Sequence, residues 1–128
     1  MTHRFQCRVY YEDTDMGGIV YHANYLKFIE RARSDWVRAL GLDQRAMKEE
    51  GTVFAVRRIA AEYLSPARFD DLLDVETEVV SARPAQMTLH QRVLRAGEAL
   101  FHAEVDLVAI GAAGRPVRLP EVLRALGG

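Results

Sequence analysis

A short stretch near the amino-terminal end combines side chains that could carry out hydrolysis. Asp15 precedes His22 with Gly17 and Gly18 between them, and an amphipathic helical pattern begins at about Ala23. The first N–H groups of a helix lack intrahelical partners and carry the positive end of its dipole, so they favour negative charge. A carboxylate facing an electrophile beside such a helix end is a plausible hydrolytic centre.

Asp15 is the candidate catalytic group, as a nucleophile or as a general base on water. It lies between the end of a strand and the start of a helix, where a concave site would have backbone donors. The alternative is a solvated turn residue or helix-start acid, because Asp is common in loops for conformational reasons. Glu12 and Asp13 are expected to be solvated loop charges or partners of nearby arginines.

Other residues of this stretch have open alternatives. His22 can hold a substrate carbonyl, orient water or offer its backbone N–H, or it can be a histidine bonded to backbone at the helix start. The Tyr11 hydroxyl can orient the catalytic carboxylate, although packing on the core face of the first strand is simpler. Gly17 and Gly18 serve a positive φ or a close approach of substrate to the backbone. Asn24 is expected to be an N-cap, with substrate contact as the alternative.

Other chemical motifs are incomplete in this sequence. Residues 13–15 are similar to the opening of a calcium-binding loop, but the twelfth position is Asn24 instead of Glu. The histidines have no metal-ligand spacing, and there is no phosphate-binding glycine fingerprint or nucleophile elbow, so no metal or cofactor is expected. Arg57, Arg58 and Arg68 can meet phosphate groups, but they also suit a solvated face or a protected edge strand.

Periodicity predicts the elements that position these residues. Alternation of apolar and polar residues indicates strands, and one apolar stripe at helical spacing indicates a long helix that stops at Gly41. A bend is expected in the second strand near Arg57. Strands are expected over residues 4–11 and 53–64. Helical segments are expected over residues 23–40, 43–49 and 120–126.

Three further strands between residues 73 and 110 are predicted to form an antiparallel meander with odd-numbered residues on the core side. The first hairpin is centred on Pro84, and the second has a three-residue loop at Gly97. The resulting register places four charged pairs opposite each other: Glu76 and Arg92, Glu78 and His90, His90 and Glu104, Arg92 and His102.

The elements add up to one α+β domain over residues 1–128, with a curved antiparallel sheet of about five strands wrapped around one long α-helix. The outer face of the last strand still carries Leu100, Val108 and Ile110, and the sheet edges need cover. A homodimer that extends the sheet or buries that strand would satisfy both needs.

Composition is that of an ordinary globular protein, with 49% hydrophobic and 27% charged residues. The 17 Lys and Arg residues against 18 Asp and Glu give a formal net charge of −1, so charge does not favour nucleic acid or an anionic membrane as partner. No signal peptide or membrane span is expected. The single cysteine, Cys7, excludes an internal disulfide and favours a reducing compartment, so the expected location is the cytoplasm.

The stretch from Tyr11 to Tyr25, with Glu30 to Arg33 after it, resembles the signature of hot-dog-fold acyl-CoA thioesterases of the 4-hydroxybenzoyl-CoA thioesterase-like family. The resemblance extends to residues 63–70, and it points in particular to the Tol-Pal-associated bacterial branch. It implies a homodimer or homotetramer with active sites at the protomer interface. It also implies hydrolysis of acyl thioesters of coenzyme A or acyl carrier protein, with a link to lipid metabolism.

By the same resemblance, Asp15 is the catalytic carboxylate, and His22 and Tyr11 are its auxiliary residues. The backbone N–H of His22 or its neighbours would polarise the carbonyl, and basic residues such as Arg57, Arg58 and Arg68 would be candidates for the coenzyme A portion. Two other functions remain open: a non-catalytic module that binds an acyl thioester or a protein, and a hydratase acting on enoyl thioesters.

Overall fold

The computed structural model describes residues 2–127. The helical segments in chain order are η1 (Tyr11–Asp13), α1 (Asn24–Ala39), α2 (Gln44–Glu49), α3 (Glu121–Arg124) and η2 (Ala125–Gly127). The strands are β1 (His3–Arg8), β2 (Val53–Tyr63), β3 (Leu72–Ala82), β4 (Gln86–Arg95), β5 (Glu98–Ile110) and β6 (Pro116–Val117).

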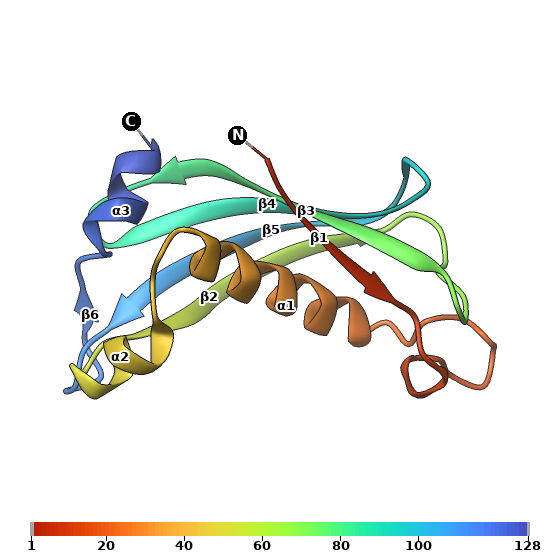
Figure 1. The fold of residues 1–128 in the computed structure, drawn as a ribbon, viewed down its shortest axis with the longest axis horizontal. Helices are drawn as coiled ribbons and strands as arrows, with labels where there is room; N and C mark the ends of the chain where they lie inside the picture. The colour runs from red at the N-terminus through yellow and green to blue at the C-terminus, as the bar shows by residue number, and fades with distance from the viewer. Residues whose placement is uncertain (1, 128) are drawn as a thin grey trace.

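All strands pair antiparallel in one sheet, in the order β1-β3-β4-β5-β2, and the short β6 pairs with β5. Figure 1 shows this sheet curving over α1, which lies across one of its faces. The helix makes contacts with β1, β3 and β4. The predicted α+β architecture is therefore confirmed, and β6 is an addition that the sequence pattern did not indicate.

The long helix forms where one apolar stripe meets the sheet. Its buried hydrophobic residues are Tyr25, Phe28, Ile29, Ala32, Trp36 and Val37. The helix ends at Ala39, and Gly41, the predicted stop, follows the C-cap Leu40 with φ +88°. The N–H of Gly41 donates to the Arg38 carbonyl and the N–H of Leu42 donates to the Val37 carbonyl, which is the hydrogen-bond pattern of a Schellman motif.

The meander has the predicted register, and all four predicted charged pairs lie opposite each other. The second turn differs from the prediction. Arg95 pairs with Glu98, so the loop holds only Ala96 and Gly97, both with positive φ as a two-residue hairpin turn requires. A bulge at Leu100 then restores the predicted register beyond it. Leu100 is fully buried within the single chain, so this residue needs no partner to cover it.

The edge strand β2 is bent as predicted, with a register shift between Val56 and Arg58 that makes Arg57 a bulge. Beyond the bulge, Ile59 pairs with Val105, so its side chain shares the core-side face. Exposed hydrophobic residues nevertheless remain along this strand and just after it: Val53, Val56, Ile59, Tyr63 and Leu64. The edge of the sheet therefore presents apolar surface that the chain itself does not cover.

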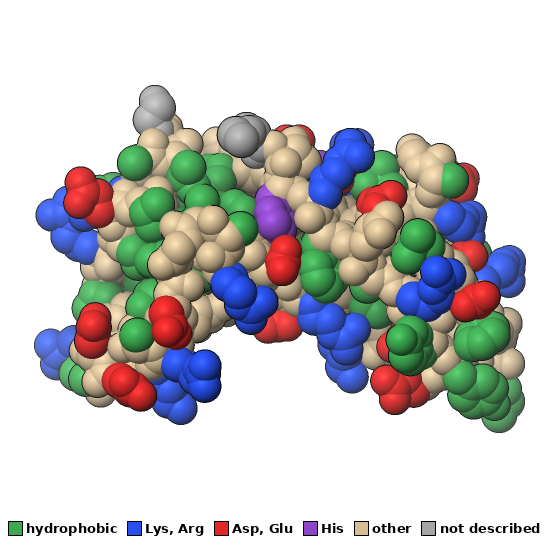
Figure 2. Space-filling model, viewed as in Figure 1, with side chains coloured by type: hydrophobic (Ala, Val, Ile, Leu, Met, Phe, Trp, Pro, Cys, Tyr) green, Lys and Arg blue, Asp and Glu red, His purple; other side chains and the backbone are tan. Residues whose placement is uncertain are grey.

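Charges of both signs are interspersed over the face drawn in Figure 2, as expected from the near-zero net charge. Hydrophobic side chains also gather at the end of the molecule that carries the loop between β1 and α1 (Figure 2). Among residues 2–127, no helix has the length and apolar character needed to cross a membrane.

Candidate active site

The loop that carries Asp15 is closed by backbone hydrogen bonds. The N–H of Asp15 donates to the Ile19 carbonyl at 2.9 Å, and the N–H of Gly18 donates to the Asp15 carbonyl at 3.0 Å. Thr14 and Val20 pair on either side of this turn. Gly18 has φ +78°, a conformation that glycine adopts without steric cost. The turn thus fixes the backbone from which the Asp15 side chain projects.

The carboxylate of Asp15 is oriented by Gly17. Its Oδ1 accepts a hydrogen bond from the Gly17 N–H at 2.8 Å, and a Cβ at position 17 would lie 3.2 Å from this oxygen. The other oxygen, Oδ2, accepts no hydrogen bond from any group in residues 2–127. The side chain is exposed in the single chain. One oxygen is therefore held in place while the other is free to meet a substrate or a water molecule.

Asp13 and Asn24, for which the sequence predicted other roles, anchor the start of α1. Asp13, expected to be a solvated charge, is only 8% exposed, and its Oδ2 accepts a hydrogen bond from the Tyr10 N–H at 2.8 Å. Asn24, expected to be the N-cap, is the first residue of the helix and is buried. Its Nδ2 donates to the Asp13 carbonyl at 2.9 Å. Asn24 therefore ties the helix to the loop instead of capping it.

The backbone just before α1 presents unpaired donors. The Asn24 N–H donates to the Tyr21 carbonyl at 2.8 Å, which closes a turn over residues 21–24. Within the described part of the chain, the N–H groups of His22 and Ala23 donate to no acceptor. These two groups stand at the positive end of the α1 dipole, so they could stabilise an oxyanion.

Asp15 and His22, which the sequence places beside the start of the helix, line the same pocket. The pocket has a volume of about 370 Å³. Its walls come from the Asp15 loop, from the first turn of α1 and from the segment that follows β2. The other lining residues are Ile19, Val20, Tyr25, Tyr63, Leu64, Ser65 and Pro66. A carboxylate, an imidazole and two phenols thus meet in a mainly apolar pocket, which is typical of a small-molecule site.

Sequence reasoning assigned no role to Tyr63, the last residue of β2. Its hydroxyl donates a hydrogen bond to the His22 carbonyl at 2.8 Å. Tyr63 is half exposed, and the partial desolvation of its phenol raises the pKa, so this group keeps its proton and can donate. Only the strand-end position of the tyrosine was visible in the sequence. Its partner lies 41 positions earlier in the chain, and no local pattern indicates such a contact.

The Tyr25 hydroxyl acts as a hydrogen-bond acceptor, whereas that of Tyr63 acts as a donor. The Tyr25 hydroxyl accepts a hydrogen bond from the Ala67 N–H at 3.0 Å. Burial raises the pKa of Tyr25, and the hydrogen bond from Ala67 only partly offsets this effect. Tyr25 therefore connects α1 to the segment after β2, while Tyr63 connects the end of β2 to the start of α1.

Of the residues predicted for the site, only Asp15 and His22 line this pocket. Tyr11 belongs to η1 and is 83% exposed, so the expectation that it packs on the core face of the first strand is wrong, because β1 ends at Arg8. Arg57 donates to Gln86 Oε1 at 3.0 Å. Arg58 lies 3.4 Å from a Glu104 oxygen. Neither arginine lines the Asp15 pocket.

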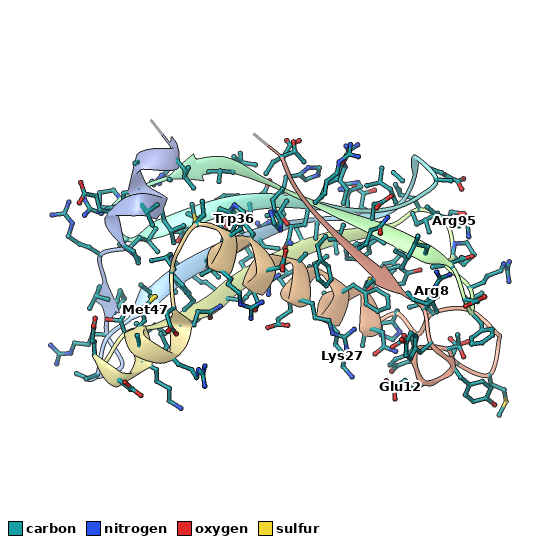
Figure 3. The ribbon with its side chains drawn as sticks, viewed as in Figure 1. Arg8, Glu12, Lys27, Trp36, Met47 and Arg95 are labelled. Atoms are coloured by element: carbon teal, nitrogen blue, oxygen red, sulfur yellow. The ribbon has the colours of Figure 1, made fainter. Side chains whose placement is uncertain are left out.

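Arg68 does lie beside the Asp15 loop, because its backbone pairs with Ile19. Its N–H donates to Asp71 Oδ2 at 2.8 Å, and Arg95 donates to the same oxygen at 2.9 Å. Arg95 also donates to the Pro66 carbonyl at 3.3 Å, which secures one wall of the pocket. Figure 3 shows Arg95 at the same end of the molecule as Glu12, which belongs to η1 in the loop.

Cys7 and a metal are poor alternatives for the chemistry of this site. Burial raises the pKa of the Cys7 thiol to about 11, and this residue lies within β1 and packs against the core, so it is a weak nucleophile. No group of three or more His, Cys, Asp or Glu side chains within residues 2–127 is arranged to hold a metal ion.

A family model described as "Thioesterase-like superfamily" matches residues 9–126 of this chain. The chain belongs to the thioesterase-like superfamily. The match includes the Asp15 loop, α1 and the whole meander, so all three walls of the pocket belong to the family's shared domain.

Relatives within the superfamily agree with this assignment. The acyl-CoA thioester hydrolase YbgC of Escherichia coli is 44% identical over 108 residues, which cover 84% of this chain and 81% of that protein. A probable thioesterase from Bartonella henselae has 36% identity and a TM-score of 0.90, over 94% of this chain and 100% of that one. A 4-hydroxybenzoyl-CoA thioesterase has 22% identity and a TM-score of 0.89, over 99% of each chain, which supports the hot-dog fold alone.

Proposed function

We propose that this protein hydrolyses acyl-CoA thioesters in the pocket formed by Asp15, His22 and the start of α1. Membership of the thioesterase-like superfamily and the YbgC relative of E. coli support the reaction class. One observation carries the choice of site: the Asp15 carboxylate, with one oxygen held by Gly17, lines a pocket at the amino-terminal end of a helix.

The thioester carbonyl would lie against the unpaired N–H groups of His22 and Ala23. These donors are fixed before the reaction, so they stabilise the oxyanion of the tetrahedral intermediate without reorganisation. Loss of one such donor in other acyl-transfer enzymes costs about 3–4 kcal/mol of transition-state stabilisation. The helix start would therefore supply a large part of the rate enhancement.

Asp15 has two routes to the products. As a nucleophile, its free oxygen attacks the carbonyl carbon and the thiolate leaves. Water then cleaves the resulting mixed anhydride to give the free acid and the original carboxylate, and the remaining proton goes to the thiolate. As a general base, Asp15 takes a proton from a water molecule that attacks the carbonyl directly, and the proton then passes to the departing thiolate. A thiolate leaves readily, so neither route needs a strong acid in the site.

His22 is proposed to assist through its side chain, because its imidazole lines the pocket and is exposed to an incoming substrate. Arg68 is the favoured candidate for contact with the phosphates of coenzyme A, since its backbone adjoins the Asp15 loop. Arg57 and Arg58 are less suited to this role because they already face Gln86 and Glu104.

A second copy of the chain is proposed to pair along β2. This strand forms the edge of the sheet, and its exposed residues include Val56, Ile59 and Tyr63. Pairing of two such edges would satisfy unpaired backbone groups and cover apolar surface in one step. Tyr63 also lines the pocket, so the partner chain would lie next to the site. The free Cys7 thiol is compatible with a cytoplasmic location.

The proposed reaction can be tested with a panel of short, long and aromatic acyl-CoA esters. Release of free thiol from at least one ester is the expected result, and acyl carrier protein thioesters in the same assay would identify the carrier. An enoyl-CoA ester is included, and its double-bond absorbance is followed. Loss of that absorbance without thiol release would indicate a hydratase, while tight binding without any reaction would indicate a binding module. Either outcome would contradict hydrolysis.

A further inference from the structure

The hydroxyl of Tyr63 donates a hydrogen bond of 2.8 Å to the His22 carbonyl. This carbonyl lies between the two unpaired donors of the site, the N–H groups of His22 and Ala23. That carbonyl follows the N–H of His22 and shares a peptide plane with the N–H of Ala23. The peptide unit is planar and trans, so the direction of the His22 carbonyl fixes the opposite direction for the Ala23 N–H. The hydrogen bond therefore orients a donor that it does not touch.

The ring of Tyr63 is held firmly enough to act as such a constraint. Its centroid lies 5.0 Å from that of Phe101 and 5.4 Å from that of Tyr25, both in edge-on packing. The backbone of Tyr63 also pairs with Phe101 in the sheet. The next N–H group, that of Leu64, donates to the Leu100 carbonyl at 2.8 Å. The hydroxyl is thus carried by a side chain whose ring and backbone are both fixed by β5 and α1.

The turn that receives this hydrogen bond needs an external constraint. Residues 21–24 are closed by the hydrogen bond from Asn24 to Tyr21, which leaves the His22 carbonyl outside the turn's own hydrogen bonding. Without Tyr63 this carbonyl would face solvent, and the peptide between residues 22 and 23 could rotate. A rotated peptide would place a carbonyl dipole near the developing oxyanion, where the reaction needs an N–H donor.

We propose that Tyr63 is a positioning residue for thioester hydrolysis, one that orients the His22–Ala23 peptide so that its free donors meet the oxyanion. This inference rests on the function proposed above. Tyr63 itself transfers no proton and makes no bond to the reacting atoms. It acts on the transition state through the backbone, so its loss is expected to lower kcat and to leave KM nearly unchanged.

The test compares Tyr63→Phe with Tyr10→Phe, because both changes remove only a hydroxyl. Tyr10 is exposed, and its hydroxyl makes no hydrogen bond within residues 2–127. In the thiol-release assay Tyr63→Phe is expected to lower kcat by about tenfold or more, with KM within about twofold of the parent value. The loss should be the same across the pH profile, since no titrating catalytic group is removed. Tyr10→Phe is expected to match the parent.

A structural measurement separates this inference from the proposed function. The ¹⁵N and ¹H amide resonances of Ala23 are expected to shift in Tyr63→Phe and to stay in place in Tyr10→Phe, with unchanged circular dichroism in both. Parent protein without activity on any thioester would contradict the proposed function, whatever the resonances do. Active parent protein with a Tyr63→Phe variant of full kcat, with a loss confined to KM, or with unshifted Ala23 resonances would overturn the positioning role.

Discussion

The N–H of Gly17 donates to Oδ1 of Asp15 at 2.8 Å, and this bond orients a carboxylate that burial does not restrain. The two residues are only two positions apart, so the loop itself provides the constraint. A side chain at position 17 would come within 3.2 Å of the same oxygen. Gly17 does not have the positive φ that the sequence offered as one reason for a glycine here. It instead serves the geometry of its neighbour Asp15, a reason that the sequence did not indicate.

Gly17→Ala is expected to lower kcat, whereas Gly18→Ala is expected to lower stability. The new methyl group at position 17 must displace the Asp15 carboxylate by a few tenths of an ångström, and kcat is expected to fall about tenfold with little loss of stability. Position 18 has open space but φ +78°, so alanine there is expected to cost about 1 kcal/mol of stability. Thiol release and urea unfolding of both variants check this. Equal effects of the two on kcat would contradict the orienting role of Gly17.

His22→Ala is expected to lower the rate less than a change at Asp15 does. The imidazole lines the pocket, but the backbone N–H of residue 22 remains in the variant. A fall of kcat of roughly ten- to hundredfold is expected for the loss of an auxiliary group. The measurement is thiol release over the acyl-CoA panel. An unchanged rate with every substrate would make His22 a purely structural residue.

Asp71 is expected to stabilise the fold in a pH-dependent manner. Burial acts to raise its pKa, but the Arg68 N–H and the Arg95 guanidinium outweigh this effect and hold the pKa below the ordinary value of an aspartate. A carboxyl group with a lowered folded pKa stabilises the protein above its unfolded pKa, and this stabilisation disappears as pH falls through the folded value. Asp71→Asn is therefore expected to cost about 1 kcal/mol at neutral pH and nearly nothing in strong acid.

Unfolding by urea at a series of pH values measures this difference between the parent and Asp71→Asn. The two free energies should converge as the pH falls through the lowered pKa of Asp71. A difference that stays constant from neutral to acidic pH would show that the carboxylate charge is not the stabilising feature.

Ile59→Lys is expected to convert a dimer into a monomer. Ile59 is 36% exposed on the edge strand β2, and a lysine there places a charge in the proposed contact. Val80→Lys is a matched control, because Val80 is 59% exposed but lies on β3, which β4 and β5 separate from β2. Sedimentation of the parent and both variants provides the measurement. A parent that sediments as a monomer, or an Ile59→Lys variant that remains a dimer, would contradict pairing along β2.

Local patterns were sufficient to predict most of the scaffold. Turns at Pro84 and Gly97 with alternating residues between them fix the register of the meander, and the apolar stripe from Tyr25 to Leu40 fixes the face of α1. The bulge at Leu100 was not predicted. A two-residue loop followed by a bulge gives the same strand register as the predicted three-residue loop, so the alternation of residues does not distinguish them.

The site was predictable only where it depends on neighbours in sequence. Asp15 and His22 lie in one loop, and they do line one pocket. The burial of Asp13 and the hydrogen bond from Asn24 depend on how the loop folds back on the helix, which periodicity does not record. The contact of Tyr63 with His22 depends on how the end of β2 meets α1, and only tertiary structure defines it.

Hydrolysis by the Asp15 carboxylate requires that replacing this group with an amide of the same size stops the reaction. Asp15→Asn keeps the size of the side chain and an oxygen that can still accept from Gly17, but it removes the nucleophile or base. Glu12→Gln is the matched control, since Glu12 is an exposed acid in the same loop. With fold and oligomeric state checked by circular dichroism and sedimentation, thiol release from acyl-CoA is expected to fall more than about a thousandfold in Asp15→Asn and to stay at the parent level in Glu12→Gln. A correctly folded Asp15→Asn variant that retains full turnover would rule out Asp15 as the catalytic group.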